Sequence, residues 1–139
     1  MNGESSPTRA VPARVLAVDD CEVMREAVAF TLRSAGYDVV EACSGRQALE
    51  LIGQEPGGAF DLVLTDWRMS DMDGLALVRA LRANGGGRYT PVVFLTGADL
   101  GTMRARSREA GADSFLEKPF RSDALLAVVA SLVPPGRHN

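Results

Sequence analysis

The sequence predicts an α/β fold in which five β/α units build a parallel sheet. Short apolar runs rich in β-branched residues recur along the chain, and helix-like segments separate them, as is typical of buried parallel strands. The connections between the runs are too short for anything other than right-handed crossovers. With 139 residues, the chain has the usual size of one domain with its own core.

The first two units have clear helix signals. The first apolar run covers residues 14–18, and Gly36 supplies a left-handed stop to the helix predicted after it. A second strand begins at Val39, and Ser44 is suited to cap a helix that continues to about Gln54. The first helix is predicted from small, polar and apolar residues that recur at the i, i+3/i+4 spacing of an amphipathic helix: Met24, Ala27, Val28, Thr31, Leu32 and Ala35.

The remaining units repeat this pattern. Their strands are predicted over residues 61–65, 92–95 and 114–117. A short Arg-rich helix is predicted from about residue 100 to 110, Ser122 is predicted to cap the last helix, and Pro134 ends it. The third and the last helix are predicted to turn these residues inward: Leu75, Val78, Leu81, Leu125, Leu126, Val129 and Leu132.

The segments outside these units are short. Residues 1–12 are predicted to form a disordered N-terminal extension, residues 13–133 the folded domain, and residues 134–139 a short C-terminal tail. The N-terminus lacks the apolar stretch of a signal peptide, and no apolar run approaches the ~20 residues that span a bilayer. We therefore expect a cytoplasmic protein without membrane insertion.

Charge and cysteine content exclude other classes of partner and site. The formal net charge is −3, which argues against a nucleic-acid partner because such proteins usually present a basic face. Cys21 and Cys43 are too few, and wrongly spaced, for a disulfide framework or a zinc site. His138 is the one histidine and lies in the tail, which excludes a phosphotransfer module with a helix-borne phosphohistidine.

Residues with reactive side chains stand where four of the apolar runs stop. Asp19 and Asp20 follow the first run, Asp66 the third, Thr96 the fourth and Lys118 the fifth. The carboxyl ends of parallel strands meet at one edge of a sheet, where open α/β sheets bind their ligands. Each residue alone could be a helix cap or a surface charge, but their shared placement predicts a site.

The chemistry of this set points to a metal ion and a phosphoryl group. Two like unit charges at ~4 Å repel by about 4 kcal/mol at an effective dielectric of 20, so three carboxylates need compensation. A hard divalent cation supplies it, and a set of oxygen ligands suits Mg²⁺. A metal ion, a lysine and a hydroxyl are equipment for phosphoryl transfer, in which an Asp can be the nucleophile and form an aspartyl-phosphate.

These residues, in this order, resemble the receiver domain of two-component response regulators (CheY-like). The resemblance covers about residues 13–133 and is strengthened by Trp67 after the middle acid, by Met72-Asp73-Gly74 and by Pro119-Phe120. It implies a flavodoxin-like, doubly wound (βα)5 fold with a five-stranded parallel sheet in the order 2-1-3-4-5.

The resemblance also implies a role for each site residue. Asp66 would accept a phosphoryl group from a phosphohistidine of a sensor histidine kinase or phosphotransfer protein. Asp20 and Asp66 would bind Mg²⁺ together with the backbone carbonyl of Arg68, and Asp19 would orient a metal-bound water. Lys118 would pair with the phosphoryl oxygens.

Two further positions would make the domain a switch. Thr96 would hydrogen-bond to the phosphoryl group and pull its loop inward, and Phe115 matches the switch aromatic of the family. A downstream target protein would bind the face made by the fourth helix, the fifth strand and the fifth helix. We expect a phosphoacceptor with no output domain, which is not an enzyme beyond self-phosphorylation and self-dephosphorylation. The segment 66–69 and parts of 98–120 look most like chemotaxis-type members.

Two alternatives belong to other classes. Asp71-Met72-Asp73-Gly74 has the D-x-D-G pattern of haloacid-dehalogenase-type phosphatases, although there the first Asp ends a buried strand and here Asp71 lies in a loop. The other alternative is an adaptor that works without phosphorylation. Within the resemblance, Arg68 and Ser70 depart from the frequent Asn and Pro; Arg68 could contact the phosphoryl group, shield it from water or be a solvated cation.

Overall fold

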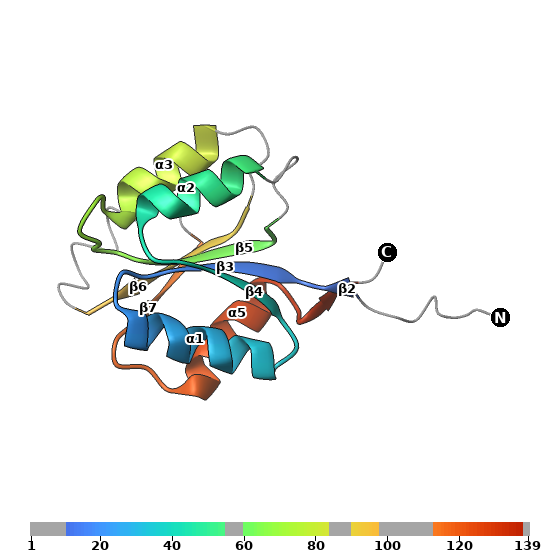
Figure 1. Ribbon diagram of the computed structural model, residues 1–139. Helices are drawn as coiled ribbons and strands as arrows, with labels where there is room; N and C mark the ends of the chain where they lie inside the picture. Colours follow the sequence, from blue (N-terminus) through green and yellow to red (C-terminus); the bar gives the residue numbers. More distant parts are fainter. Residues whose placement is uncertain (1–10, 55–59, 84–89, 98–112, 138–139) are drawn as a thin grey trace.

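The five predicted strands form a parallel sheet in the computed structural model, which describes residues 11–54, 60–83, 90–97 and 113–137 (Figure 1). The strand order is β4-β3-β5-β6-β7. Counted along the chain, this is the predicted order 2-1-3-4-5. The strands are β3 (Arg14–Val18), β4 (Asp38–Ala42), β5 (Leu62–Asp66), β6 (Val92–Thr96) and β7 (Ser114–Glu117).

The helices that the structure describes cover both faces of the sheet (Figure 1). Helices α1 (Glu22–Ser34) and α5 (Ser122–Leu132) pack on one face, and α2 (Gly45–Gln54) and α3 (Gly74–Ala83) pack on the other. The central strand β3 shows why both faces are buried: Val15 and Ala17 join the α1/α5 side, while Leu16 and Val18 join the α2/α3 side. Successive side chains of a strand point to opposite faces of the sheet, so a continuous apolar run indicates a strand that is covered on both faces.

The helix caps were only partly predicted. The Ser44 hydroxyl accepts a hydrogen bond from the Gln47 N–H at 3.0 Å, as predicted for a cap of α2. The prediction that Ser122 caps the last helix is wrong, because Ser122 is already its first residue and the extended residue before it is Arg121. In α1, Ala29 is buried and Ala27 is exposed, so the inward face is turned slightly from the predicted one. The Arg-rich helix predicted at about 100–110 lies outside the described residues.

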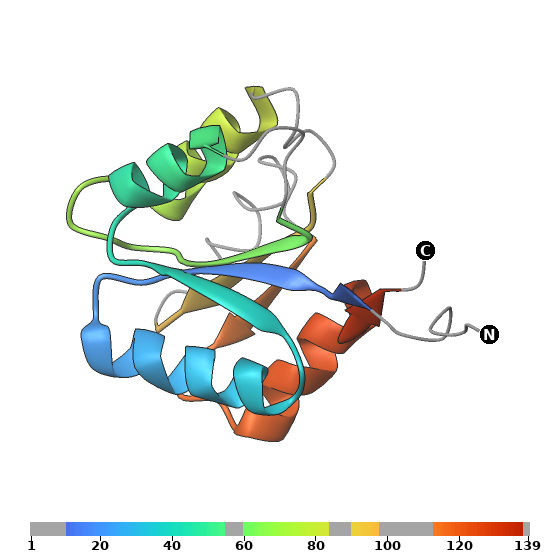
Figure 2. The same cartoon turned by 45° about the vertical axis from the view of Figure 1, so that its right-hand side comes forward.

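Short segments near the two ends of the described chain pair with each other. Strand β2 (Val11–Pro12) pairs antiparallel with β8 (Gly136–Arg137), at the edge of the sheet opposite the carboxyl ends (Figure 2). The Ala13 N–H also donates to the Pro135 carbonyl at 2.9 Å. Residues 11–12 of the predicted N-terminal extension are thus paired with residues 136–137 of the predicted tail. Pro134 and Pro135 cannot continue a helix, so the chain turns back toward the first residues of the domain.

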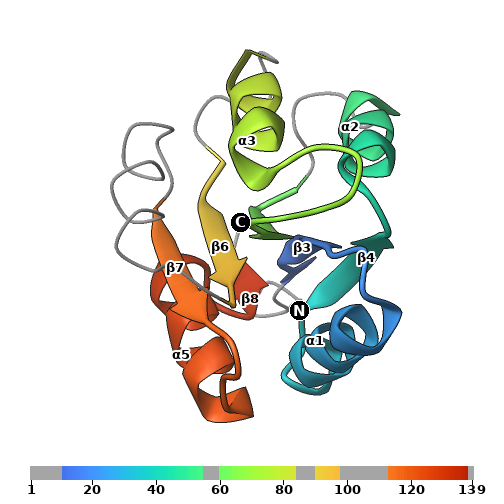
Figure 3. The same cartoon turned by 90° about the vertical axis from the view of Figure 1, so that its left-hand side faces the viewer.

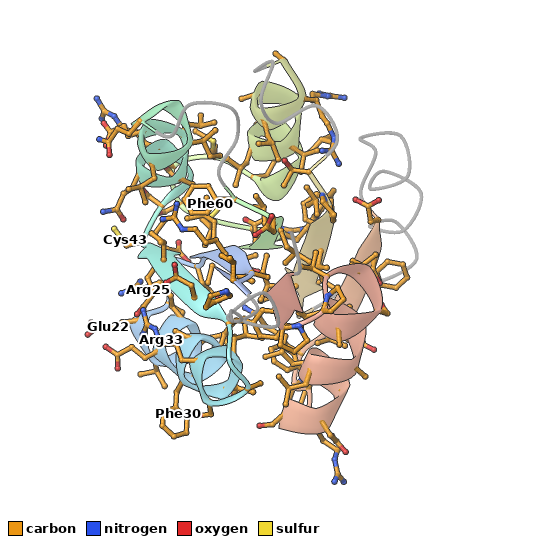
Figure 4. The ribbon with its side chains drawn as sticks, turned by 90° about the vertical axis from the view of Figure 1, so that its right-hand side faces the viewer. Glu22, Arg25, Phe30, Arg33, Cys43 and Phe60 are labelled. Carbon is orange, nitrogen blue, oxygen red and sulfur yellow. The ribbon has the colours of Figure 1, made fainter. Side chains whose placement is uncertain are left out.

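Helix α1 is fixed to β4 by two arginines, Arg25 and Arg33, which share one carboxylate; both arginines are labelled in Figure 4. Arg25 and Arg33 contact the two oxygens of Glu41 at 3.2 and 3.1 Å. Arg25 also donates to the backbone carbonyl of Asp19 at 3.0 Å. The same side chain therefore fixes the end of β3, where the acidic pair begins.

None of the helices in the described ranges is long and apolar enough to cross a membrane. The sheet, the two helix layers and the β2/β8 pair account for the described elements.

We predict opposite effects of adding one methyl group at two helical glycines. A Cβ at Gly74 would lie 2.7 Å from the Phe94 ring and 2.9 Å from the Asp66 carbonyl oxygen, whereas a Cβ at Gly53 would meet nothing within 4 Å. Gly74→Ala should lower the free energy of unfolding by about 1–3 kcal/mol through overpacking. Gly53→Ala should raise it by up to about 1 kcal/mol through helix propensity.

Denaturant unfolding of both variants, followed by circular dichroism, measures these changes. An unaltered midpoint for Gly74→Ala would contradict the close packing of α3 on the end of β5.

Candidate functional site

The carboxyl ends of the parallel strands form one edge of the sheet, and Figure 3 views the molecule from this side. The strand register aligns the ends: Val18 pairs with Thr65, Asp66 with Leu95, and Thr96 with Glu117. Five of the predicted site residues therefore end or follow a strand at this edge: Asp19, Asp20, Asp66, Thr96 and Lys118. Phe115, in contrast, lies within β7.

Three carboxylates gather here. One oxygen from each of Asp19, Asp20 and Asp66 lies within 4.8 Å of the others. Asp19 is buried, Asp66 is half-buried and Asp20 is exposed to solvent. A cluster that offers only carboxylate oxygens suits a hard divalent cation such as Mg²⁺, which commonly binds through one or two carboxylates and keeps several waters.

The Lys118 ammonium lies between two of these acids. Its Nζ is 3.3 Å from Asp19 Oδ2 and 3.4 Å from Asp66 Oδ1. Among the described residues, Lys118 is the cation that forms ion pairs with these acids, and its one charge leaves an excess of negative charge when all three carboxylates are ionised. The fold thus brings the carboxylates together into an anionic site that added positive charge would stabilise. The sequence predicted this need for a compensating cation.

Burial raises the pKa of Asp66 above its ordinary value. Lys118 acts in the opposite direction, while the nearby Asp19 carboxylate raises the pKa further. A hydrogen bond from the backbone N–H of Arg68 also favours the charged form. The net direction shows that the charged carboxylate of Asp66 is held in an unfavourable environment, which a bound cation would relieve.

Backbone N–H groups hold the two acids of the β3–α1 loop. The Cys21 N–H donates to Asp19 Oδ1 at 2.9 Å, and the Ser70 N–H donates to Asp20 Oδ2 at 2.9 Å. The second bond comes from a different loop, the one between β5 and α3. This bond was not predicted from the sequence. The one signal for it is that position 70 is not Pro, which has no N–H to donate.

A pocket opens beside Asp66 on the side of β6 and β7. Thr96 is buried in it, and its backbone carbonyl accepts a hydrogen bond from the Lys118 N–H at 2.6 Å. The Lys118–Pro119 peptide bond is cis. The pocket is lined by Asp66, Trp67, Arg68, Thr96, Gly97 and Lys118. The predicted hydroxyl and ammonium residues are therefore neighbours of the predicted nucleophile.

Two aromatic residues lie near this edge. Trp67, the residue after Asp66, is buried and contacts Phe94 edge-to-face, with ring centroids 4.9 Å apart. This aromatic contact attaches Trp67 to the core. Phe115 is half-buried and packs against the core on the α2/α3 side. Of the face predicted to bind a target, the structure describes β7 and α5, while the helix between β6 and β7 lies outside the described residues.

Asp71 and Asp73 are not part of the carboxylate cluster. Asp73 Oδ1 accepts the Ala76 N–H at 2.8 Å at the start of α3, and Asp71 accepts N–H groups at the start of α2. Both carboxylates thus stabilise helix ends. This placement does not favour the phosphatase alternative, which needs the first Asp of the pair at the end of a buried strand. Cys21 and Cys43 are exposed free cysteines.

Known proteins share this sequence and fold. The model of the response regulator receiver domain matches residues 15–130. The chain is 35% identical over 123 residues to the two-component response regulator ORR11 of Oryza sativa, an alignment that covers 88% of this chain and 82% of that protein. It is 38% identical over 123 residues to the response regulator MprA of Mycolicibacterium vanbaalenii, where it covers 88% of this chain but only 51% of MprA. The chain therefore spans about half the length of that relative.

Solved structures agree with these sequence matches. The chemotaxis protein CheY4 of Vibrio cholerae superposes with a TM-score of 0.83 and 33% identity, over 88% of this chain and 100% of that one. The receiver domain of the sensor histidine kinase PA1611 of Pseudomonas aeruginosa, solved with a magnesium ion in its active site cleft, gives a TM-score of 0.78 and 30% identity over 88% and 98% of the two chains. With the acidic cluster, the lysine and the fold in agreement, the chain belongs to the response regulator receiver domain family.

Proposed function

We propose that the protein is an Mg²⁺-dependent phosphoacceptor switch, in which Asp66 receives a phosphoryl group from a sensor histidine kinase or a phosphotransfer protein. One observation carries this proposal: the Lys118 ammonium contacts both Asp19 and Asp66 within an acidic cluster completed by Asp20. The magnesium ion in the PA1611 receiver domain supports Mg²⁺ as the cation.

The transfer is a substitution at phosphorus. A carboxylate oxygen of Asp66 attacks the phosphorus of the phosphohistidine, a P–O bond forms, and the P–N bond breaks with its electron pair passing to the imidazole nitrogen. Lys118 pairs with the phosphoryl oxygens, where negative charge develops. Asp20, Asp66 and the backbone carbonyl of Arg68 would hold Mg²⁺, which when bound supplies further positive charge to the same oxygens. Asp19 completes the acidic set and keeps Lys118 in place.

The switch follows from the pocket beside Asp66. Thr96 approaches the new phosphoryl group and hydrogen-bonds to it, and Phe115 on the neighbouring strand changes its position in response. A target protein reads this change on the face formed by the segment before β7, β7 and α5. The response is a local change of charge that biases a two-state element. A role in chemotaxis stays a prediction.

Asp66 should be the aspartate that carries the phosphoryl group. Incubation with acetyl phosphate and Mg²⁺ should add one phosphoryl group to the protein, as measured by intact mass, and Asp66→Asn should abolish the addition. Asp38→Asn is the matched control, because Asp38 is an exposed aspartate at the start of β4, away from the carboxyl edge. Full phosphorylation of Asp66→Asn would contradict the proposal, and wild-type signalling by that variant would favour the adaptor.

Asp66→Asn should also stabilise the metal-free fold at neutral pH. The folded-state pKa of Asp66 is raised above its ordinary value of 3.8, so its ionisation costs folding free energy as the pH rises from 3.8 through the folded value. Asparagine avoids this cost, and the stabilisation should disappear as the pH falls below 3.8. Denaturant unfolding in EDTA at several pH values measures the difference; a gain that is constant with pH would contradict the assignment.

Arg68 should prolong the phosphorylated state. The residue is exposed at the pocket that Asp66 lines, where its guanidinium can shield the phosphoryl group from water. Arg68→Ala should shorten the lifetime of the aspartyl-phosphate by about two- to fivefold, because an exposed charge contributes up to about 1 kcal/mol. Arg68→Lys keeps the charge and is the control. An unchanged hydrolysis rate in Arg68→Ala would remove this role.

A further inference from the structure

The loop between β5 and α3 is held by backbone pairing at its base and by hydrogen bonds to other elements at its tip. At the base, the Gly74 N–H donates to the Trp67 carbonyl at 2.8 Å, and the backbones of Arg68 and Asp73 pair in an isolated antiparallel β-bridge. At the tip, the Ser70 N–H donates to Asp20 Oδ2 at 2.9 Å. The tip therefore touches one of the three acids of the proposed metal site.

The next residue of the tip, Asp71, is bound to the start of α2. Its Oδ1 accepts the Gly45 N–H at 3.2 Å and its Oδ2 accepts the Arg46 N–H at 2.8 Å, a contact between residues 25 positions apart. Figure 3 shows the loop after β5 passing close to the start of α2 before it enters α3. Both carboxylate oxygens are used, so the loop tip is held at two points on one helix end.

These bonds satisfy N–H groups at the start of α2. The first four N–H groups of a helix have no partner within the helix. Here Gly45 and Arg46 donate to Asp71 and Gln47 donates to the Ser44 hydroxyl, while the Ala48 N–H makes the first bond of the helical ladder, to the Ser44 carbonyl. Asp71 thus supplies, from a different loop, the acceptors that the segment before α2 leaves out.

The side chain of Met72 packs beside the contact between Asp71 and the start of α2. A Cβ at Gly45 would lie 2.3 Å from Met72 Cγ and 2.6 Å from its Sδ, so the side chain packs directly on the glycine. Burial acts to raise the pKa of Asp71, but hydrogen bonds from four backbone N–H groups, those of Arg46, Gly45, Asp71 itself and Met72, bring it below its ordinary value. The carboxylate therefore stays charged, and the contact stays intact, at neutral pH.

We propose that Asp71 is a positioning residue for the metal site: by fixing the loop tip to α2, it holds the Ser70 N–H against Asp20 and orients that carboxylate before a cation binds. The inference rests on the Mg²⁺ site of the proposed function. It assigns to Asp71 and to the Ser70 backbone a role in cation affinity, although neither touches the cation.

The physical reason is preorganisation. A carboxylate that is already oriented loses less conformational freedom when it becomes a ligand, and hydrogen bonds to ligating carboxylates typically change metal affinity by about 10- to 100-fold. Asp71 acts one step further out, through Ser70, so its removal should cost less. At position 70 the backbone N–H is what matters: any residue with an N–H can make the bond to Asp20, but Pro cannot.

The test measures the dissociation constant of Mg²⁺ by calorimetry for the wild-type protein and for Asp71→Ala. The constant should rise about three- to tenfold in the variant, below the range for direct partners of ligands. In the metal-free proteins, the Ser70 amide hydrogen should exchange faster in Asp71→Ala. Asp73→Ser is the charge control, because it removes the same charge from the same loop while serine can still cap α3; its affinity should match the wild type.

A double-mutant cycle separates positioning from charge. Ser70→Ala keeps the N–H and should bind Mg²⁺ as the wild type does, whereas Ser70→Pro should bind it more weakly. In the Ser70→Pro background, Asp71→Ala should cause no further loss, because the bond through which it acts is gone. Asp71→Asn, which keeps one carbonyl acceptor for α2, should have an intermediate effect and serves if Asp71→Ala does not fold.

The outcomes distinguish this inference from the proposed function. Equal Mg²⁺ affinity in the wild type, Asp71→Ala and Asp71→Asn would overturn the positioning role alone. The same loss from Asp71→Ala in both backgrounds, or an equal loss in Asp73→Ser, would overturn it too, because the effect would then come from charge. No Mg²⁺ binding by the wild type would overturn the proposed metal site and this inference with it.

Discussion

The chemistry of the site depends on one electrostatic constraint at the carboxyl edge of the sheet. Among the described residues, the Lys118 ammonium forms ion pairs with two acids of a cluster of three carboxylates. Asp19 follows β3 and Asp66 ends β5, so the pairing of these neighbouring parallel strands brings both residues to the same edge. Burial is the main cause of the raised pKa of Asp66, and the nearby Asp19 carboxylate raises it further. Added positive charge, or a change of the Asp66 carboxylate itself, relieves this unfavourable environment.

The surroundings hold this strained arrangement through backbone groups more than through other charges. The N–H groups of Cys21 and Ser70 orient the two acids of the first loop, and Arg25 fixes the carbonyl of Asp19 while it is itself held by Glu41. These contacts come from α1, from β4 and from the loop after β5. The acidic edge is thus connected to elements on both faces of the sheet, which is what a site needs if a local change there is to be sensed elsewhere.

Much of the fold and of the site could be predicted because both follow from short-range patterns. Apolar runs give the strands, and the position of a residue directly after a run places it at the carboxyl edge, as for Asp66 and Lys118. The prediction that Ser122 caps a helix was wrong because helix boundaries shift by a residue with the local backbone. The β2/β8 pairing was missed since Val11 and Arg137 are far apart in sequence and neither segment has a strand pattern of its own.

By itself, the sequence predicted the α/β class and the placement of five reactive side chains at the carboxyl ends of strands, because strand periodicity and strand ends are encoded locally. The strand order was predicted only from the family resemblance. Only the tertiary structure decided how the acids are held and what Asp71 does. In the sequence, Asp71 belongs to a D-x-D-G pattern that suggests catalysis; in the fold it binds the start of a helix 25 residues away. A hydrogen bond depends on where packing places the donor and the acceptor, and no local pattern carries that information.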